Sequence, residues 1–249
     1  MKHIFILTSI FLFFFVDSFA QNLVPNPSFE VYEECPWDVT TYPQKSLIPF
    51  WYLPNNGTSD YFNSCAKFLV NVPNNFIGNL WAFEGNAYTG IILKEFHPDD
   101  TTNRKAKNYR EYLQAELKMP LIINQKYIVQ MHYAVATYST YAVNRLGIHF
   151  SNHKIKKRSS CRVLYYKPQI QLDIDSINIE CEIWHELTDT LTAKGGEKFI
   201  TIGNFFDDQS TNHYKLNIEN LNKPLQDNIN KNGLAYYYID MIMVRKIDN

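Results

Sequence analysis

The sequence predicts an all-β fold in the form of a single β-sandwich. Aromatic residues make up 15% of the 249 residues, and most lie in short runs bounded by Pro, Gly, Asn and Asp. Aromatic and β-branched residues favour strands, whereas those four residue types favour turns. Turn-forming clusters at 54–57, 194–196 and 230–233 separate the runs, and this pattern favours a sandwich over a helical fold.

The first twenty residues predict a secretory signal peptide. Lys2 and His3 precede the apolar run 4–16, and small residues at positions 18 and 20 precede Gln21. This run is too short to span a bilayer, which takes about 20 residues. We therefore expect a signal peptide at 1–20 and one sandwich domain at 21–249, because single sandwiches reach about 200 to 250 residues. The expected product is exported and not membrane-spanning, and it lies in the periplasm, at the outer membrane or outside the cell.

Several segments of the mature chain have the composition of strands. They are 23–31, 67–72, 87–95, 109–117, 126–137, 146–151, 169–173, 183–191, 197–205 and 235–245. Successive side chains of a strand point to opposite faces, so Ile200 and Ile202 share one face and Phe199 and Thr201 the other. One of these faces should lie in the core.

Segment 109–118 is open to two interpretations. Its composition suits a helix, and its apolar residues recur at intervals near three and four. As a strand, it would instead place Leu113, Ala115 and Leu117 together on one wholly apolar face. The family resemblance described below favours the strand.

The cysteines predict disulfide bonds. Cys35, Cys65, Cys161 and Cys181 all lie in the part of the chain that we expect to be exported. Three pairings are possible, and order along the chain suggests Cys35 with Cys65 and Cys161 with Cys181. Zinc binding is the alternative, but no two of the cysteines have the two-residue spacing that zinc ligands usually show.

The charge balance argues against nucleic acid as a partner. The formal net charge is -1, whereas binding to phosphates requires clustered Lys and Arg. One basic cluster, 154–158, lies in a predicted loop. We interpret it as a solvated loop tip, with an anion-binding or membrane-surface patch as the alternative.

No catalytic motif is present in the sequence. It contains neither Gly-x-Ser-x-Gly nor His-Glu-x-x-His. The carboxylates at 99–100 and 207–208 are adjacent, whereas glycoside hydrolysis needs two carboxyls that converge at about 5 to 9.5 Å. We expect those pairs to lie in turns, and we expect His132 and His149 to be structural. The protein is therefore predicted not to be an enzyme, and an envelope polysaccharide hydrolase is the least favoured alternative.

The two ends of the mature chain carry the motifs Gln21-Asn-Leu-Val-Pro-Asn-Pro-Ser-Phe-Glu30 and Ala235-Tyr-Tyr-Tyr-Ile-Asp240. They resemble the opening and closing strands of galactose-binding-like jelly rolls, the β-sandwich type of many carbohydrate-binding modules. The motifs between them resemble a family of exported Gram-negative bacterial proteins, in which this domain often precedes an OmpA-type or secretion-sorting domain. These motifs are Glu34-Cys-Pro36, Trp51, Gly57-Thr-Ser-Asp-Tyr-Phe-Asn63, Gly85-Asn-Ala-Tyr-Thr-Gly90, Tyr109-Arg-Glu-Tyr112, Ala193-Lys-Gly-Gly-Glu197 and Thr201-Ile-Gly-Asn-Phe205.

The resemblance implies a jelly roll over the whole mature chain. Because only five residues follow Val244, we expect the sandwich to act alone or with a separate partner. The resemblance also implies a structural Ca²⁺ between the first and last strands, held by Glu30 and Asp240. Calcium takes about six to eight oxygen ligands, so backbone carbonyls would have to complete the set. The alternative is that both carboxylates are hydrogen-bonded structural residues.

Aromatic side chains on the surface predict a glycan site. The C–H face of a sugar ring stacks on Trp and Tyr, while neighbouring amides and carboxylates bind its hydroxyls. We expect most rings, including Trp51 and Trp184, to lie in the core. The ligand-binding candidates in predicted loops are Trp37, Tyr42, Tyr61, Asp60 and Asn63. The sequence thus predicts an exported, non-catalytic module of the cell envelope or surface that binds a glycan. The alternative is a structural subunit of an outer-membrane or secretion assembly that binds an envelope protein.

Overall fold

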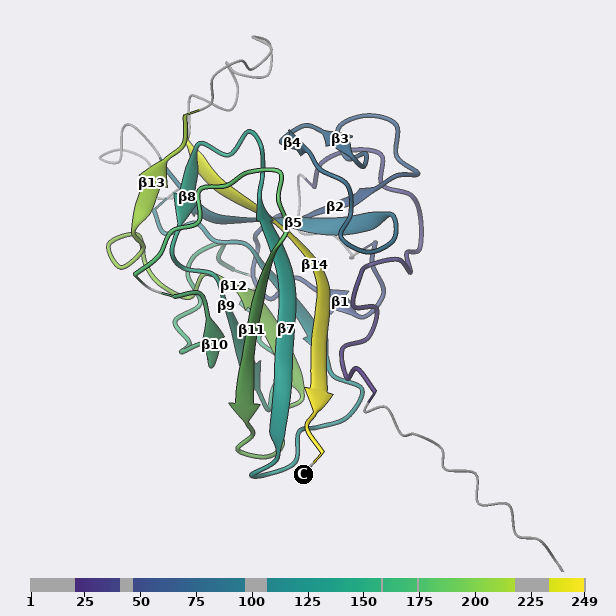
Figure 1. The fold of residues 1–249 in the computed structure, drawn as a ribbon, viewed down its shortest axis with the longest axis vertical. Coiled ribbons are helices and arrows are strands. Elements are labelled where there is room, and N and C mark those ends of the chain that lie inside the picture. The colour runs from purple at the N-terminus through teal and green to yellow at the C-terminus, as the bar shows by residue number, and fades with distance from the viewer. Residues whose placement is uncertain are drawn as a thin grey trace, which may run out of the picture.

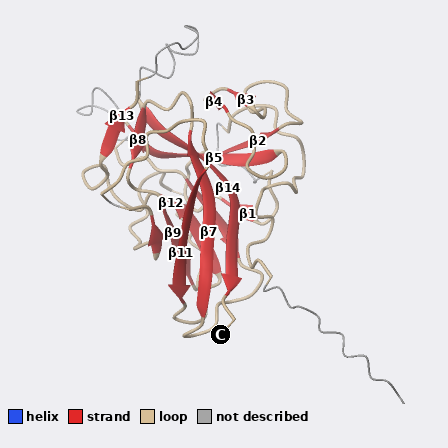
Figure 2. Cartoon of the chain, viewed as in Figure 1, coloured by secondary structure: helices blue, strands red, loops and turns tan. Residues whose placement is uncertain are grey.

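The computed structural model describes residues 21–40, 47–96, 107–157, 159–173, 175–217 and 233–248. Within these ranges every regular element is a β-strand (Figure 2). The signal peptide predicted at 1–20 and the ligand candidate Tyr42 lie outside the described residues. The described ranges hold no helix of the length and apolarity needed to cross a membrane.

Two five-stranded antiparallel sheets pack face to face (Figure 1). The first sheet has the order β1 (Trp51–Tyr52), β6 (Tyr112–Glu116), β12 (Phe199–Gly203), β9 (Gly147–Ser151) and β10 (Ile170–Gln171). The second has the order β11 (His185–Thr192), β7 (Lys126–Val135), β14 (Leu234–Lys246), β5 (Ala87–Glu95) and β2 (Asp60–Asn63). Two short pairs flank them, β13 (His213–Lys215) with β8 (Tyr141–Val143) and β3 (Asn74–Asn75) with β4 (Gly78–Asn79). The predicted all-β sandwich of jelly-roll type is confirmed.

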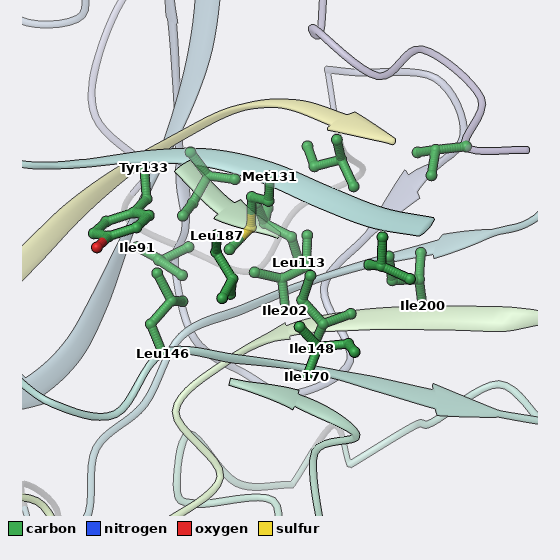
Figure 3. Packing of buried hydrophobic residues seen from close by; sticks show 14 of the residues in the cluster. Ile91, Leu113, Met131, Tyr133, Leu146, Ile148, Ile170, Leu187, Ile200 and Ile202 are labelled. Atoms are coloured by element: carbon green, nitrogen blue, oxygen red, sulfur yellow. The ribbon is translucent and has the colours of Figure 1, made fainter. Parts of the chain in front are cut away.

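The main hydrophobic core lies between the two sheets (Figure 3). Ile148, Ile200 and Ile202 contribute to it from the first sheet, and Met131 and Leu187 contribute from the second. Full burial of an aliphatic side chain of this size contributes about 1.5 to 3 kcal/mol, so this layer is the main source of stability.

A second hydrophobic cluster lies on the opposite face of the second sheet. Along β14, Tyr237 and Ile239 point into the core between the sheets, whereas Tyr236 and Tyr238 point into the second cluster. The strand can do this because its side chains alternate between faces. Gly90 in β5 makes room for the outer rings, since a Cβ atom there would overlap the Tyr236 ring. β14 is therefore buried on both faces.

Most of the predicted strands are confirmed. β5 has the bounds expected for segment 87–95. Segment 109–118 contains strand β6 and no helix, with Leu113 and Ala115 in the main core and Gln114 on the other face, bonded to Thr201. Both faces of β12 are buried, whereas we expected only one face in the core.

The opening segment 23–31 is not a strand, contrary to prediction. Asn26 and Phe29 have positive φ angles of 45° and 61°, and Pro25 and Pro27 have no N–H to donate to a ladder. The segment still runs beside the last strand, because Leu23 N donates to Val244 O at 2.8 Å. Segment 67–72 is likewise not a strand, and Val70 and Val72 within it pack into the second cluster.

The cysteines form one of the two predicted disulfides. Cys35 and Cys65 are bonded, with their Cα atoms 6.0 Å apart. Cys161 and Cys181 are both free, so that prediction was wrong. The reason is topological. Cys161 O accepts from Arg110 N beside the first sheet, whereas Cys181 bridges to Val135 in the second.

We expect replacement of both Cys35 and Cys65 with Ala to lower the free energy of unfolding by about 3 to 4 kcal/mol. The bond joins residues 30 apart, and a loop of that length restricts the unfolded chain by about this amount. Urea denaturation of the two proteins measures the difference. The matched control is Cys161→Ala, which removes a free thiol. An equal loss of stability in the control would contradict the assignment.

Candidate functional site

A cavity of about 200 Å³ opens at one edge of the sandwich. It lies where β1 and β2 are edge strands of their sheets, and two loop segments around 34–40 and 47–53 complete its wall. Its lining residues are Glu34, Trp37, Asp38, Val39, Thr40, Leu47, Ile48, Trp51, Tyr52, Leu53, Ser59, Asp60, Tyr61, Thr89 and Leu113. Three of the predicted ligand residues, Trp37, Asp60 and Tyr61, therefore lie around one cavity.

The rim of the cavity is aromatic and exposed. The Trp37 side chain is 83% exposed, which is the largest value among the large hydrophobic residues described. Tyr52 lies at the rim as well, with Lys154 Nζ 2.9 Å from the centre of its ring. One lysine of the basic cluster thus packs against the cavity rim, where we had expected a fully solvated loop tip. Trp37 offers a free ring face to a ligand.

The floor of the cavity is buried and partly polar. Trp51 is in the core as predicted, with its Nε1 donating to Asn26 O at 3.0 Å. Ser59, Asp60 and Thr89 are also buried and line the cavity. The Ser59 and Thr89 hydroxyls donate to Tyr112 O and Ile239 O at 3.2 and 3.4 Å. The cavity therefore combines an exposed ring at its mouth with buried polar residues in its lining.

Tyr61 and Asn63 are structural, contrary to our expectation of exposed loop residues. Both belong to strand β2 and are buried. Tyr61 Oη donates to Phe29 O at 3.0 Å and accepts from Asn63 Nδ2 at 2.7 Å. Asn63 Oδ1 accepts from Cys65 N at 2.9 Å, and Asn63 does not line the cavity. Burial raises the pKa of Tyr61, which therefore stays neutral.

Asp60 is a buried carboxyl at the floor of the cavity. Its Oδ1 accepts from Thr40 N at 2.8 Å, and its Oδ2 accepts from Tyr236 Oη at 2.6 Å. Burial raises the pKa of Asp60 to about 7, and the nearby negative charge of Glu111 adds to the shift. The Tyr236 hydroxyl thus connects β14, the last strand, to a residue that lines the cavity.

Glu111 is a second buried carboxyl that we did not predict. Its oxygens accept from the amides of Thr58 and Ile92 at 3.1 and 2.8 Å, and from Tyr109 Oη at 2.7 Å. Burial raises its pKa, while these hydrogen bonds lower it. The motif Tyr109-Arg-Glu-Tyr112 was a sequence signal for it, but nothing in that motif indicated proximity to Asp60. The bonded oxygens hold the loop before β2 against β6.

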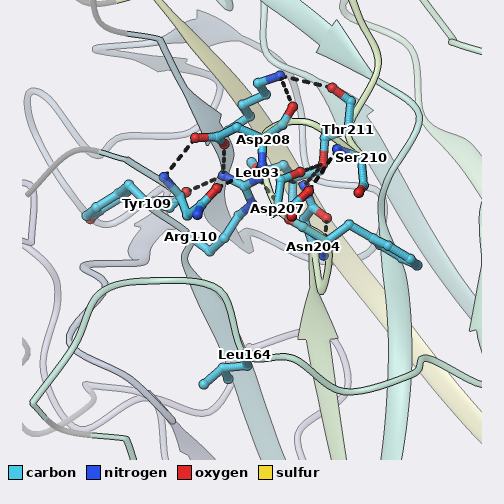
Figure 4. A network of polar contacts seen from close by, with 12 residues as sticks. Leu93, Tyr109, Arg110, Leu164, Asn204, Asp207, Asp208, Ser210 and Thr211 are labelled. Carbon is cyan, nitrogen blue, oxygen red and sulfur yellow. Dashed lines mark hydrogen bonds and ion pairs between the residues drawn. The ribbon is translucent and has the colours of Figure 1, made fainter. Parts of the chain in front are cut away.

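A buried arginine, Arg110, lies just before β6 in a network of polar contacts (Figure 4). Arg110 forms an ion pair with Asp208 at 2.9 Å, and its Nη2 donates to Phe206 O at 2.9 Å. Lys94 Nζ donates to the backbone oxygens of Asp208 and Thr211, both at 2.9 Å. This network holds the 204–211 turn in place, in line with the turn expected for the adjacent carboxylates 207–208.

Glu30 and Asp240, the predicted calcium ligands, hold one backbone loop between the opening segment and the last strand, β14. Glu30 Oε1 accepts from the amides of Asn86 and Ala87 at 2.8 and 2.9 Å. Asp240 Oδ2 accepts from the amides of Phe83 and Glu84 at 2.9 and 3.1 Å. The predicted hydrogen-bonded structural role is therefore present.

Both members of this pair are carboxylates, the type of oxygen ligand that calcium prefers, but their oxygens already accept from backbone amides. Glu84 lies close by, with its carboxylate bonded to Ser28 Oγ. Burial raises the pKa of Asp240 to about 8, and the negative charge of Glu30 contributes to the shift, so a nearby cation would favour the ionised form. Among the described residues, no three His, Cys, Asp or Glu side chains are arranged to hold a metal. Backbone carbonyls or water would have to supply the remaining ligands.

Comparison with known proteins gives structural similarity only. No family model matches the chain, and no curated protein sequence matches it. An arabinose-bound α-L-arabinofuranosidase, MgGH51, aligns over 92% of this chain at 10% identity with a TM-score of 0.43, and the chain spans about a quarter (26%) of its length. The CBM22-1 xylan-binding domain from Paenibacillus barcinonensis Xyn10C aligns over 86% of this chain and 99% of its own, at 8% identity and a TM-score of 0.41.

A third similar structure is the K1 cleaved adhesin domain of Lys-gingipain from Porphyromonas gingivalis W83. It aligns over 84% of this chain and 98% of its own length, at 11% identity and a TM-score of 0.38. Because the three identities are so low, no residue of this chain takes a role from them.

We expect Asp60→Asn to reduce the dependence of stability on pH. The folded protein keeps the Asp60 proton up to about pH 7, whereas the unfolded chain loses it near the ordinary aspartate pKa of 3.8. Between these values the folded state binds more protons, so the free energy of unfolding falls as the pH rises. Urea denaturation from about pH 4 to 8 should show a smaller fall in the variant. Asp38→Asn, at an exposed position, is the control, and equal slopes in all three proteins would contradict the buried carboxyl.

Proposed function

We propose that this chain is an exported, non-catalytic binding module that takes a glycan in the cavity beside Trp37. The observation that carries the proposal is the exposed Trp37 ring at the mouth of a cavity whose lining includes the buried polar residues Ser59, Asp60 and Thr89. Sugars combine an apolar C–H face with a belt of hydroxyls, and this cavity offers a partner to each.

The geometry gives each part of the cavity a role. Trp37 provides the stacking face, and Glu34 and Asp38 lie beside it in the lining as exposed acceptors for hydroxyl groups. Ser59 and Thr89 line the cavity below, and their hydroxyls donate to Tyr112 O and Ile239 O. The floor is built from strands of both sheets, so the site exists before the ligand arrives and little ordering accompanies binding.

The buried carboxyls support a non-catalytic role. Asp60 accepts hydrogen bonds on both oxygens, and Glu111 accepts them from two amides and two hydroxyls. Carboxyls engaged in this way hold the backbone and are poorly placed to exchange protons with a substrate. The Cys35–Cys65 disulfide supports export, because such bonds persist in oxidising compartments.

We expect Trp37→Ala to lower the affinity for oligosaccharides by about tenfold or more, because it removes the stacking face. The experiment is a glycan array with the wild-type protein, followed by calorimetric titration of each oligosaccharide that binds. Tyr165→Ala is the matched control, since Tyr165 is 71% exposed and does not line the cavity.

Two outcomes would contradict the glycan site. One is an empty array together with a stoichiometric envelope protein that copurifies with the chain, which would favour the assembly subunit. The other is oligosaccharide binding that Trp37→Ala leaves unchanged, which would place the site elsewhere.

We further propose that Glu30 and Asp240 bind a structural Ca²⁺. A ligand that binds only the folded state stabilises it by about 2.7 kcal/mol at a hundredfold excess over its Kd, so calcium should raise the midpoint of urea denaturation. Glu30→Gln keeps an oxygen for the amides of Asn86 and Ala87 but removes the charge, and it should abolish the effect. Asp38→Asn is the control. Identical wild-type midpoints in millimolar calcium and in chelator would overturn this proposal.

A further inference from the structure

A second exposed aromatic surface lies on the outer face of the β11-β7-β14-β5-β2 sheet. Met131 and Tyr133 of β7 point into the core between the sheets, so Gln130 and His132 point outward. The Phe83 ring stacks on His132, with ring centres 3.5 Å apart. Trp81 and Trp184 adjoin Phe83, and none of these side chains lines the Trp37 cavity. We call Trp81, Phe83 and Trp184 the outer aromatic surface.

The outer aromatic surface is held in place by its own contacts. Phe83 N donates to Asp240 Oδ2 at 2.9 Å, and Trp184 Nε1 donates to Trp81 O at 2.8 Å. The Trp184 ring lies edge-on to Tyr88, which belongs to the second cluster, so Trp184 is only partly buried, whereas we expected it in the core. Trp81 is 69% exposed and Phe83 is 46% exposed. The Phe83 and Trp184 rings are therefore positioned in advance, which lowers the entropy cost of stacking a ligand on them, and Trp81 is open to solvent beside them.

Polar groups border the rings along the same face. Gln130 Nε2 donates to Glu186 Oε2 at 2.7 Å, and Glu186 pairs across the strands with His132, beneath Phe83. Leu187 and Leu191 of β11 point into the core, so the alternate residues point outward, and they are exposed. These outward residues are Glu186, Thr188, Thr190 and Thr192. A row of hydroxyls thus continues from the aromatic surface along β11.

This composition favours a polysaccharide over a protein as the occupant. The central part of a protein interface is depleted of charged and polar groups, whereas here the outward side of β11 is wholly polar. Exposed rings followed by a line of hydroxyl and amide groups match the alternating apolar and hydroxyl surfaces of a sugar chain. Side chains of both charge signs, Glu186 and Lys126, border this row, so the face has no single-sign patch that would select an anionic polymer.

We propose that the outer aromatic surface and the adjoining threonines of β11 form a second binding surface, for a neutral polysaccharide chain. The proposal rests on the proposed function, because it assumes that the protein binds glycans. It uses none of the residues of the Trp37 cavity, so each site is tested separately. Its ligand is an extended polymer, whereas the cavity takes a short segment.

The test compares two exposed tryptophans in the same protein. Trp81→Ala and Trp37→Ala each remove a ring that is largely exposed, and Trp81 keeps its backbone oxygen for Trp184. Tyr165→Ala is the control, and circular dichroism confirms that each variant is folded. The probes are soluble arabinoxylan, β-1,4-galactan and β-1,3-glucan in native affinity electrophoresis, and the corresponding trisaccharides in calorimetry.

For the polymer that retards the wild type, we expect Trp81→Ala to lower the apparent affinity measured by retardation about tenfold. The affinity for trisaccharides should stay unchanged. If the polymer retards Trp81→Ala as much as the wild type but no longer retards Trp37→Ala, the second surface is overturned and the cavity proposal stands. If Trp81→Ala loses retardation by the polymer and Trp37→Ala keeps it, the second surface is supported and the proposal of a glycan site in the cavity is overturned. If no polymer retards the wild type and no trisaccharide binds it, both proposals fail.

Discussion

The burial of strand β14 on both faces is the constraint on which the rest of this structure depends. Its side chains alternate, so Tyr237 and Ile239 complete the core between the sheets while Tyr236 and Tyr238 complete the cluster outside it. Each outer tyrosine then has a buried hydroxyl that needs a partner. Tyr236 finds it in Asp60 at the cavity floor, and Tyr238 finds it in Asn75 at 2.7 Å.

The same strand positions the other two candidate sites. Asp240 follows the three tyrosines and Ile239 in β14, and its carboxyl accepts hydrogen bonds from the amides of Phe83 and Glu84. This contact fixes the loop that carries Trp81 and Phe83 of the outer aromatic surface. It also brings Asp240 opposite the opening segment, where Glu30 accepts from the amides of Asn86 and Ala87, just after Gly85. The cavity, the calcium candidate and the outer surface are thus linked through one strand. Substitutions at its inner positions should therefore be more damaging than the test variants, all of which lie outside it.

Segments whose composition agrees with their burial were predicted well. Features that depend on contacts with distant parts of the chain were not. Segment 87–95 has the composition of a strand and matches β5, because local preference and burial agree there. Segment 23–31 was expected to be a strand, but positive φ angles at Asn26 and Phe29 break it. Tyr61 was expected at the surface because it follows a turn, and yet pairing with β5 buries it. Glu111 gave no local signal of its role, since its carboxyl is defined by amides that are distant in the sequence.

The all-β class and the candidacy of Trp37 follow from composition and turn residues, which are local properties of the chain. Order along the chain suggested Cys35–Cys65, but it suggested Cys161–Cys181 equally, and only the first pair forms. Which rings are free depends on the folded structure. Trp37 and Trp81 are exposed while Trp51 is buried, although all three lie close to turn-forming residues in the sequence. The folded structure also decided that Asp60 lines a cavity and that Cys161 and Cys181 lie beside different sheets. Exposure and proximity arise from the pairing of distant strands, and that pairing is a property of the folded chain as a whole.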